Sequence, residues 1–140
     1  MVSGGLEVAC AGPDMKRSVQ LVLALFFAVA GVLHFYLDDV FANIVPPVLP
    51  FPIAIVWITG VMELGFALGL MLTYRLSVTG LLLGLYLLAV LPANVYMAMA
   101  GIPLGQIELG AGVLWGRVAL QFPLIALVLW ATGAPPFRSR

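Results

Sequence analysis

Five polar side chains interrupt the long apolar stretches of this 140-residue chain, and their types could carry chemistry. They are His34, Glu63, Asn94, Arg117 and Gln121. Ionisable groups within a membrane span are costly and are a functional hypothesis by default. Imidazole, carboxyl, amide and guanidinium groups suit proton exchange and hydrogen bonding to a carbonyl of an apolar ligand, of which a quinone is one example. We therefore interpret Glu63 as the proton-exchanging residue and the other four as ligand-binding residues.

The same residues exclude several other kinds of site. His34 and Glu63 supply only two metal ligands and are expected at different depths, so no metal site is predicted. Ser18 and Ser77 are expected at the opposite side of the membrane from His34, so they cannot form a serine–histidine–acid set with it. Cys10 is the single cysteine, which excludes an intramolecular disulfide and a redox pair.

Composition identifies the environment that these residues share. The chain is 64% hydrophobic and 9% charged, with a mean hydropathy of +1.18 and six side chains of each sign. Soluble domains carry about 25% charged residues, so a cytosolic globular protein and a disordered chain are both excluded. Six scattered basic residues form no patch for a nucleic acid. The composition therefore predicts an integral membrane protein whose surroundings are the lipid bilayer.

Four apolar stretches are long enough to cross a bilayer as helices, which takes roughly 20 residues each. We expect an all-α transmembrane four-helix bundle over residues 18–133. Residues 1–17 are expected to form a disordered cytoplasmic N-terminus that begins at either Met1 or Met15, and residues 134–140 a cytoplasmic tail. The expected helices are 18–37, 51–74, 76–100 and 113–132.

Basic residues predict the orientation of the bundle, because cytoplasmic loops and ends carry an excess of lysine and arginine. With four spans, five basic residues fall on one side, which places both termini in the cytoplasm and the protein in the inner or plasma membrane. Arg117 opposes this bias, so we expect it to pair with a carboxylate. The five residues are Lys16, Arg17, Arg75, Arg138 and Arg140, and the candidate partners of Arg117 are Glu108, Asp38, Asp39 and Glu63.

The first external loop, residues 38–52, combines prolines with apolar side chains. Pro46, Pro47 and Pro50 stiffen it, so we interpret it as a rigid lid folded over the outer end of the bundle. Asp38 or Asp39 is expected to cap a short helix at its start.

Three pairs of glycines at GxxxG spacing predict close helix packing within the bundle, with a homodimer face as the alternative. The pairs are Gly65 with Gly69, Gly80 with Gly84, and Gly112 with Gly116.

Glu63 lies eleven residues beyond Pro52, which corresponds to a depth of roughly 16 Å. An unpaired carboxylate is strongly disfavoured at that depth, so Glu63 is either neutral or reached by Arg117 or His34. We expect it to face a cavity in the bundle that is also lined by His34, Asn94 or Gln121. The molecule expected in that cavity is apolar with a polar head.

Several short segments, in this order and spacing, resemble the DoxX family of small membrane proteins. They are GVLHF at 31–35, VPP at 45–47 with LP at 49–50, GVMEL at 60–64, PANVYM at 92–97 and RVALQ at 117–121. The resemblance covers residues 18–130 and implies a four-helix transmembrane bundle. Members are linked with a thiosulfate:quinone oxidoreductase subunit, with membrane oxidoreductase complexes in oxidative-stress defence and, in related animal proteins, with receptor assembly. The residues that match family motifs are His34, Pro47, Glu63, Asn94, Arg117 and Gln121.

These observations lead to one principal functional hypothesis and two alternatives. The principal one is a ligand-binding subunit of a membrane redox system, with a bound quinone or lipid and with a partner membrane or redox protein that carries the electrons. If the protein acts in an enzyme, it is a non-electron-carrying subunit of a quinone-linked oxidoreductase. The alternatives are a non-catalytic membrane assembly or chaperone-like protein and a small proton-coupled exporter.

Overall fold

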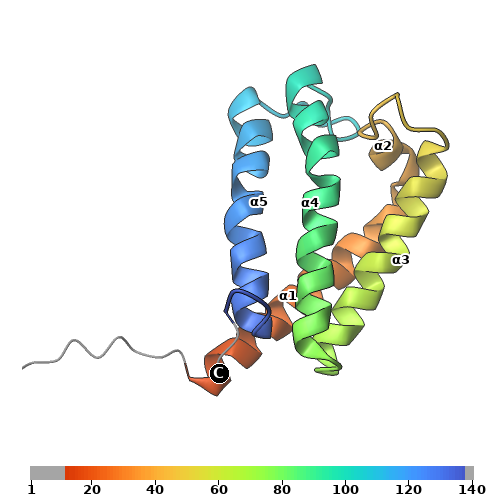
Figure 1. The fold of residues 1–140 in the computed structure, drawn as a ribbon. Coiled ribbons are helices and arrows are strands. Elements are labelled where there is room, and N and C mark those ends of the chain that lie inside the picture. Colours follow the sequence, from red (N-terminus) through yellow and green to blue (C-terminus); the bar gives the residue numbers. More distant parts are fainter. Residues whose placement is uncertain (1–11, 138–140) are drawn as a thin grey trace, which may run out of the picture.

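The computed structural model describes residues 12–137, and they form a bundle of four long helices with one short helix at its edge (Figure 1). The elements are α1 (Pro13–Tyr36), α2 (Asp38–Ala42), α3 (Pro52–Met71), α4 (Leu76–Ala100) and α5 (Ala111–Thr132). Helices α1, α3, α4 and α5 are long and apolar enough to cross a bilayer. The all-α four-helix transmembrane architecture is therefore confirmed, and the chain is a multi-pass membrane protein.

The helix bounds differ by more than one residue from the expected ones at three places. Helix α1 begins at Pro13 rather than at residue 18, so the expectation of disorder is wrong for residues 13–17. Met15, Lys16 and Arg17 are good helix formers, and they extend the apolar helix without a break. Helix α3 ends at Met71 instead of residue 74, and α5 begins at residue 111 instead of 113. Residues 1–11 of the expected N-terminal segment and residues 138–140 of the expected C-terminal tail lie outside the described residues.

The four long helices pack as two pairs. Helix α1 packs mainly on α3, and α4 packs mainly on α5, while α1 with α5 and α3 with α4 join the pairs. Figure 1 shows α4 and α5 side by side, with α1 running diagonally behind them and α3 diverging from α4 toward the end where α2 lies. The main core contains Phe27, Leu70, Leu83 and Val128 and lies in the half of the bundle near the termini.

A close approach between α1 and α3 depends on two glycines that face each other. A Cβ atom on Gly60 would lie 2.9 Å from the Cβ of His34 and 3.1 Å from the carbonyl oxygen of Gly31. Real Cβ contacts are almost never shorter than about 3 Å, since carbon atoms pack best at about 3.5–4.0 Å. Only glycine therefore allows the two helices to cross at this distance.

The glycine pairs at GxxxG spacing divide into two groups. Gly69 lies against Thr79, Gly80 against Thr132, and Gly84 against Leu129, so packing within the bundle is confirmed for these three. The prediction of close packing within the bundle is wrong for the other three glycines, because a Cβ atom added at any of them would meet nothing within 4 Å. Those three are Gly65, Gly112 and Gly116.

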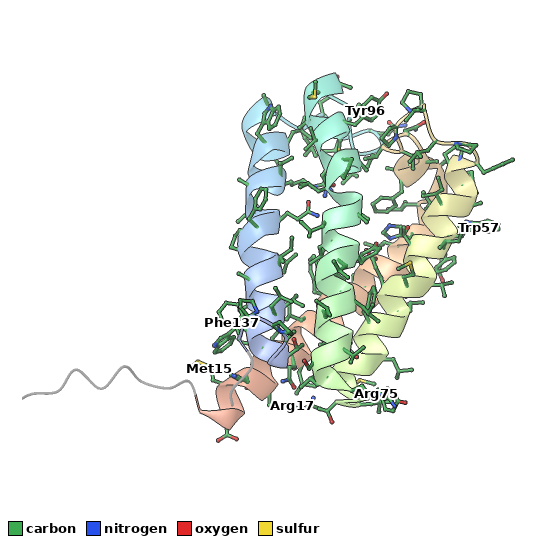
Figure 2. The ribbon with its side chains drawn as sticks, in the orientation of Figure 1. Met15, Arg17, Trp57, Arg75, Tyr96 and Phe137 are labelled. Carbon is green, nitrogen blue, oxygen red and sulfur yellow. The ribbon has the colours of Figure 1, made fainter. Side chains whose placement is uncertain are left out.

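Polar side chains at the start of α1 tie three helices together at the end that holds both termini. Arg17 donates to the carbonyl oxygens of Leu70 at 3.1 Å and Met71 at 2.8 Å, and Gln20 donates to the carbonyl oxygen of Ala131 at 2.8 Å. These carbonyl groups belong to the last turns of α3 and α5, where no N–H group of the same helix is available as a donor. Figure 2 shows Met15, Arg17, Arg75 and Phe137 at this end and Tyr96 at the opposite one.

The loop between α1 and α3 starts with the short helix α2, as predicted, although no aspartate caps it. The N-cap is Leu37, and Asp38 and Asp39 occupy the first turn instead. Ile44, which follows α2, is buried against Met97, Ala98 and Leu114 of α4 and α5. The first part of the loop therefore bridges the two helix pairs at the outer end, by which we mean the end opposite the termini.

Candidate functional site

A buried cluster joins three helices through His34 of α1, Glu63 of α3 and Tyr86 of α4. The Nδ1 atom of His34 lies 3.3 Å from Oε2 of Glu63, and the hydroxyl of Tyr86 donates to Oε1 of Glu63 at 2.7 Å. Glu63 is only 7% exposed, and Tyr86 is buried as well. The buried carboxyl group is therefore reached by His34, which is one of the two outcomes expected for it.

The expectation that His34 and Glu63 lie at different depths is wrong, because their side chains close the gap between their backbone positions. His34 is one turn beyond Gly31 in α1, and Glu63 is one turn beyond Gly60 in the antiparallel α3. A helical side chain leans toward the N-terminus of its own helix. The two N-termini lie at opposite ends of the bundle, so the imidazole and the carboxyl group lean toward each other.

The neighbours of the imidazole determine which of its nitrogens carries hydrogen. Nδ1 lies 2.8 Å from the carbonyl oxygen of Ala30 as well as 3.3 Å from Oε2 of Glu63. A carbonyl oxygen can only accept, so Nδ1 carries the hydrogen and points it at Ala30. The ring stacks on Phe41 of α2 at 4.4 Å between centroids, which fixes its orientation.

One oxygen of the cluster has no hydrogen-bond partner. Oε2 of Glu63 is buried, and no donor among residues 12–137 bonds to it. A buried acceptor without a partner costs about 1–3 kcal/mol when the group is neutral and more when it is charged. A negative charge on this oxygen would have no donor to balance it, so the position favours the neutral carboxyl group over the ionised one.

A cleft of about 1170 Å³ separates α3 from α4 on the side of Tyr86. Its walls are apolar except for a few hydroxyl groups, among them those of Thr59 and Tyr86. The loop before α3 covers its outer end through Val45, Pro46, Val48 and Leu49.

The predicted polar residues do not line this cleft. Glu63 and His34 are not among its wall residues, and Asn94 of α4 and Gln121 of α5 bond to each other instead, so this cleft is not the expected cavity lined by Glu63 together with one of them. The predicted lid residues also separate, because Pro46 lines the cleft whereas the exposed Pro47 and Pro50 do not. Only Tyr86 belongs both to the cleft wall and to the buried cluster.

The remaining predicted residues form a second polar group, between α4 and α5. Asn94 donates to Oε1 of Gln121 at 2.8 Å, and Gln121 donates in turn to the carbonyl oxygen of Leu87. Arg117 donates to Sδ of Met97 at 3.0 Å and reaches Oδ1 of Asn94 at 3.5 Å. This chain of donors and acceptors holds the two helices in register.

The expectation that Arg117 pairs with a carboxylate is wrong for the described part of the chain. The single pair there at ion-pair distance joins His34 and Glu63. Two of the candidate partners are engaged elsewhere, since Asp38 accepts a hydrogen bond from Trp57 at 3.1 Å and Glu63 accepts one from Tyr86.

Tyr86 is the functional candidate that the sequence analysis missed. It lies in an uninterrupted apolar run and carries no charge, so neither hydropathy nor charge distinguishes it. A signal was present in its position, because a buried phenol hydroxyl needs a hydrogen-bond partner and Tyr86 lies near the middle of α4, far from either interface.

Comparison with known proteins gives a family without a described activity. A family model described as "Domain of unknown function (DUF8561)" matches residues 23–132. This range contains both polar groups and the whole cleft. No curated protein and no solved structure matches the chain.

Proposed function

This chain belongs to the DUF8561 family, and we propose that it is a ligand-binding subunit of a membrane redox system. The ligand is an apolar molecule that carries a carbonyl group, and a quinone has both properties. The observation that carries this proposal is the double role of Tyr86, which lines the apolar cleft and donates to the buried Glu63.

The cleft has the shape and chemistry of a site for an elongated apolar molecule. Its wall residues run from Tyr74 and Thr79 near one end of α3 and α4 to Val45 and Leu49 at the other end. Binding sites for small molecules are mostly apolar with few polar groups, which orient the ligand. A long hydrocarbon tail fits along the cleft, with the polar head beside Tyr86.

The buried cluster provides a route for one proton to such a head. When Glu63 is ionised, the Tyr86 hydrogen is held by Oε1 at 2.7 Å and is not free for a ligand. When Glu63 is protonated, its carboxyl group can donate to the Tyr86 oxygen, and Tyr86 then donates its own hydrogen to a ligand carbonyl. Protonation of Glu63 thus favours ligand binding, and His34 orients the carboxyl group from the other side.

The protein's place in a redox system is inferred from its chemistry and its resemblance to the DoxX family. The residues of the site are suited to hydrogen bonding and proton exchange, and a partner membrane or redox protein carries the electrons. Arg17 and Arg75 lie at the same end as both described termini (Figure 2). By the positive-inside rule we place that end in the cytoplasm, and the protein in the inner or plasma membrane.

Removal of the Tyr86 hydroxyl tests the proposal. The full chain is purified in detergent, and the binding of a benzoquinone with a decyl tail is titrated for the wild type and for Tyr86→Phe. A hydrogen bond contributes about 1 kcal/mol, so we expect the variant to bind roughly threefold to tenfold more weakly. Tyr96→Phe is the matched control, because Tyr96 lies on the same helix at its outer end and does not line the cleft (Figure 2).

Decylbenzene, which has the same tail but no carbonyl group, is the control ligand. Its affinity should be the same for the wild type and Tyr86→Phe, because it makes no hydrogen bond. Equal quinone affinity of the wild type and Tyr86→Phe, with both proteins folded, contradicts the proposed site.

An assembly or chaperone-like role is the second candidate, and one feature of the cleft favours it. Gly65 and Gly69 both line the cleft at GxxxG spacing, and although Gly69 lies against Thr79, a Cβ atom on Gly65 would meet nothing within 4 Å. Small residues at this spacing let another transmembrane helix approach closely. In this case Gly65→Leu disrupts the complex with the partner helix, whereas Tyr86→Phe and Glu63→Gln leave it intact.

A further inference from the structure

Arg117 is the one predicted site residue whose charge the described part of the chain does not balance. It is half-buried in α5, a membrane-spanning helix, and no carboxylate among residues 12–137 lies within ion-pair distance of it. Its two contacts are weak for a guanidinium group with five donors, since one is a thioether and the other an amide oxygen at 3.5 Å. The group therefore keeps donors and a full positive charge for a further partner.

The guanidinium group lies close to the level at which α4 ends. Met97, which Arg117 contacts, is three residues before Ala100, the last residue of α4, and this corresponds to roughly 5 Å along the helix axis. A side chain of α5 leans toward residue 111, the start of that helix, which is at the same end. The charge thus reaches the boundary between the hydrocarbon region and the headgroups, as is usual for arginine near a span end.

The flank of α5 beside Arg117 is open. Val113 and Leu120, which lie one turn before and after Arg117, are 54% and 67% exposed, and a Cβ atom on Gly116 would meet nothing within 4 Å. Since α5 spans the membrane, lipid covers this flank. A group that approaches Arg117 from the side is therefore part of the lipid layer or of the water just outside it.

We propose that Arg117 binds a phosphate group at the outer end of the bundle. A phosphate matches the planar fork of the guanidinium group and supplies the missing negative charge. A lipid headgroup is one source of this group and free phosphate in the adjacent water is the other. The site is distinct from the cleft between α3 and α4, so it does not depend on the proposed quinone.

The test uses the full chain in phosphatidylcholine vesicles that contain phosphatidylglycerol with a diazirine on its headgroup. After illumination, the labelled peptides are quantified separately for the outer end, around residues 94–121, and for the end that holds Arg17 and Arg75. We expect Arg117→Gln to lower labelling of the outer end roughly tenfold, because a charge-assisted hydrogen bond is lost. Labelling of the opposite end should stay unchanged and is the internal control.

Three further arms identify the bound group and keep the test decisive. Arg117→Lys retains the charge and should retain most of the labelling, and a diazirine-bearing diacylglycerol without phosphate should not label the wild type at the outer end. Competition by inorganic phosphate indicates that free phosphate binds as well, and its absence restricts the site to lipid. Equal outer-end labelling in the wild type and Arg117→Gln overturns the proposal. Equal labelling by the phosphate-free lipid overturns it too, even where a variant fails to fold.

A carboxylate from a second copy of the chain is the competing partner for Arg117. It would appear, after treatment of the vesicles with a bifunctional protein cross-linker, as a dimer that both Arg117→Gln and Glu108→Gln abolish, with no dependence on the lipid headgroup. That result also overturns the proposal.

Discussion

The glycine crossing between α1 and α3 sets the distance between His34 and Glu63, so a single methyl group at that crossing should disturb both stability and the site. In Gly60→Ala the added Cβ atom would lie 2.9 Å from the Cβ of His34 and 3.0 Å from Cε2 of Phe35. Carbon atoms pack best at about 3.5–4.0 Å, so the helices must separate by roughly 1 Å. The contact of 3.3 Å between His34 and Glu63 lies one turn away and should lengthen.

The expected energy follows from two opposing effects. Overpacking costs about 1–3 kcal/mol, and replacing glycine by alanine within a helix returns up to about 1 kcal/mol. Gly60→Ala should therefore lower the free energy of unfolding by roughly 1–2 kcal/mol. Gly65→Ala, on the same helix, gains the helical preference without a clash, because its Cβ atom would meet nothing within 4 Å.

The two variants are compared by unfolding the purified protein in mixed detergent micelles, with helix content followed by circular dichroism. We expect Gly65→Ala to be as stable as the wild type or slightly more stable, and Gly60→Ala to be the least stable of the three. Equal stability of the two variants would refute the close crossing, and so would a Gly60→Ala protein that matches the wild type.

Three other predictions concern the hydrogen bonds of Arg17, the buried carboxyl group of Glu63 and the orientation of the protein in the membrane. Arg17→Ala removes two charge-assisted hydrogen bonds to the last carbonyls of α3, so it should lower the free energy of unfolding by about 1.5–3 kcal/mol. Arg75→Ala, at an exposed position, should lower it by less than about 0.5 kcal/mol. Equal effects of the two variants in the same unfolding assay would show that the hydrogen bonds of Arg17 do not stabilise the bundle. The affinity for the decyl benzoquinone should rise as the pH falls, because Glu63 then takes up a proton. The Glu63→Gln variant should bind this quinone with an affinity that does not depend on pH. If the variant keeps the wild-type pH profile, a group other than Glu63 titrates. An impermeant maleimide should leave Cys10 unlabelled in sealed right-side-out cells, and labelling would show that the predicted orientation is wrong.

The spans and the set of polar residues within them followed from the sequence by itself. Hydropathy and charge are local properties, so four apolar runs predict four helices, and an even number of spans places both ends on one side. Glu63 was recognised as a residue that must be neutral or paired, because the cost of a charge in a membrane depends on depth and not on its neighbours. The short helix after residue 37 was likewise visible in the loop.

The partners of those residues were decided only by the tertiary structure. Helix α1 packs on α3 and α4 on α5, and no local pattern specifies which helices are neighbours. The contact between His34 and Glu63 exists because two glycines let the helices cross closely and because side chains of antiparallel helices lean toward each other. The same arrangement directs Tyr86 to Glu63 and leaves Arg117 without a carboxylate among the described residues, since each partner depends on the relative rotation and tilt of whole helices.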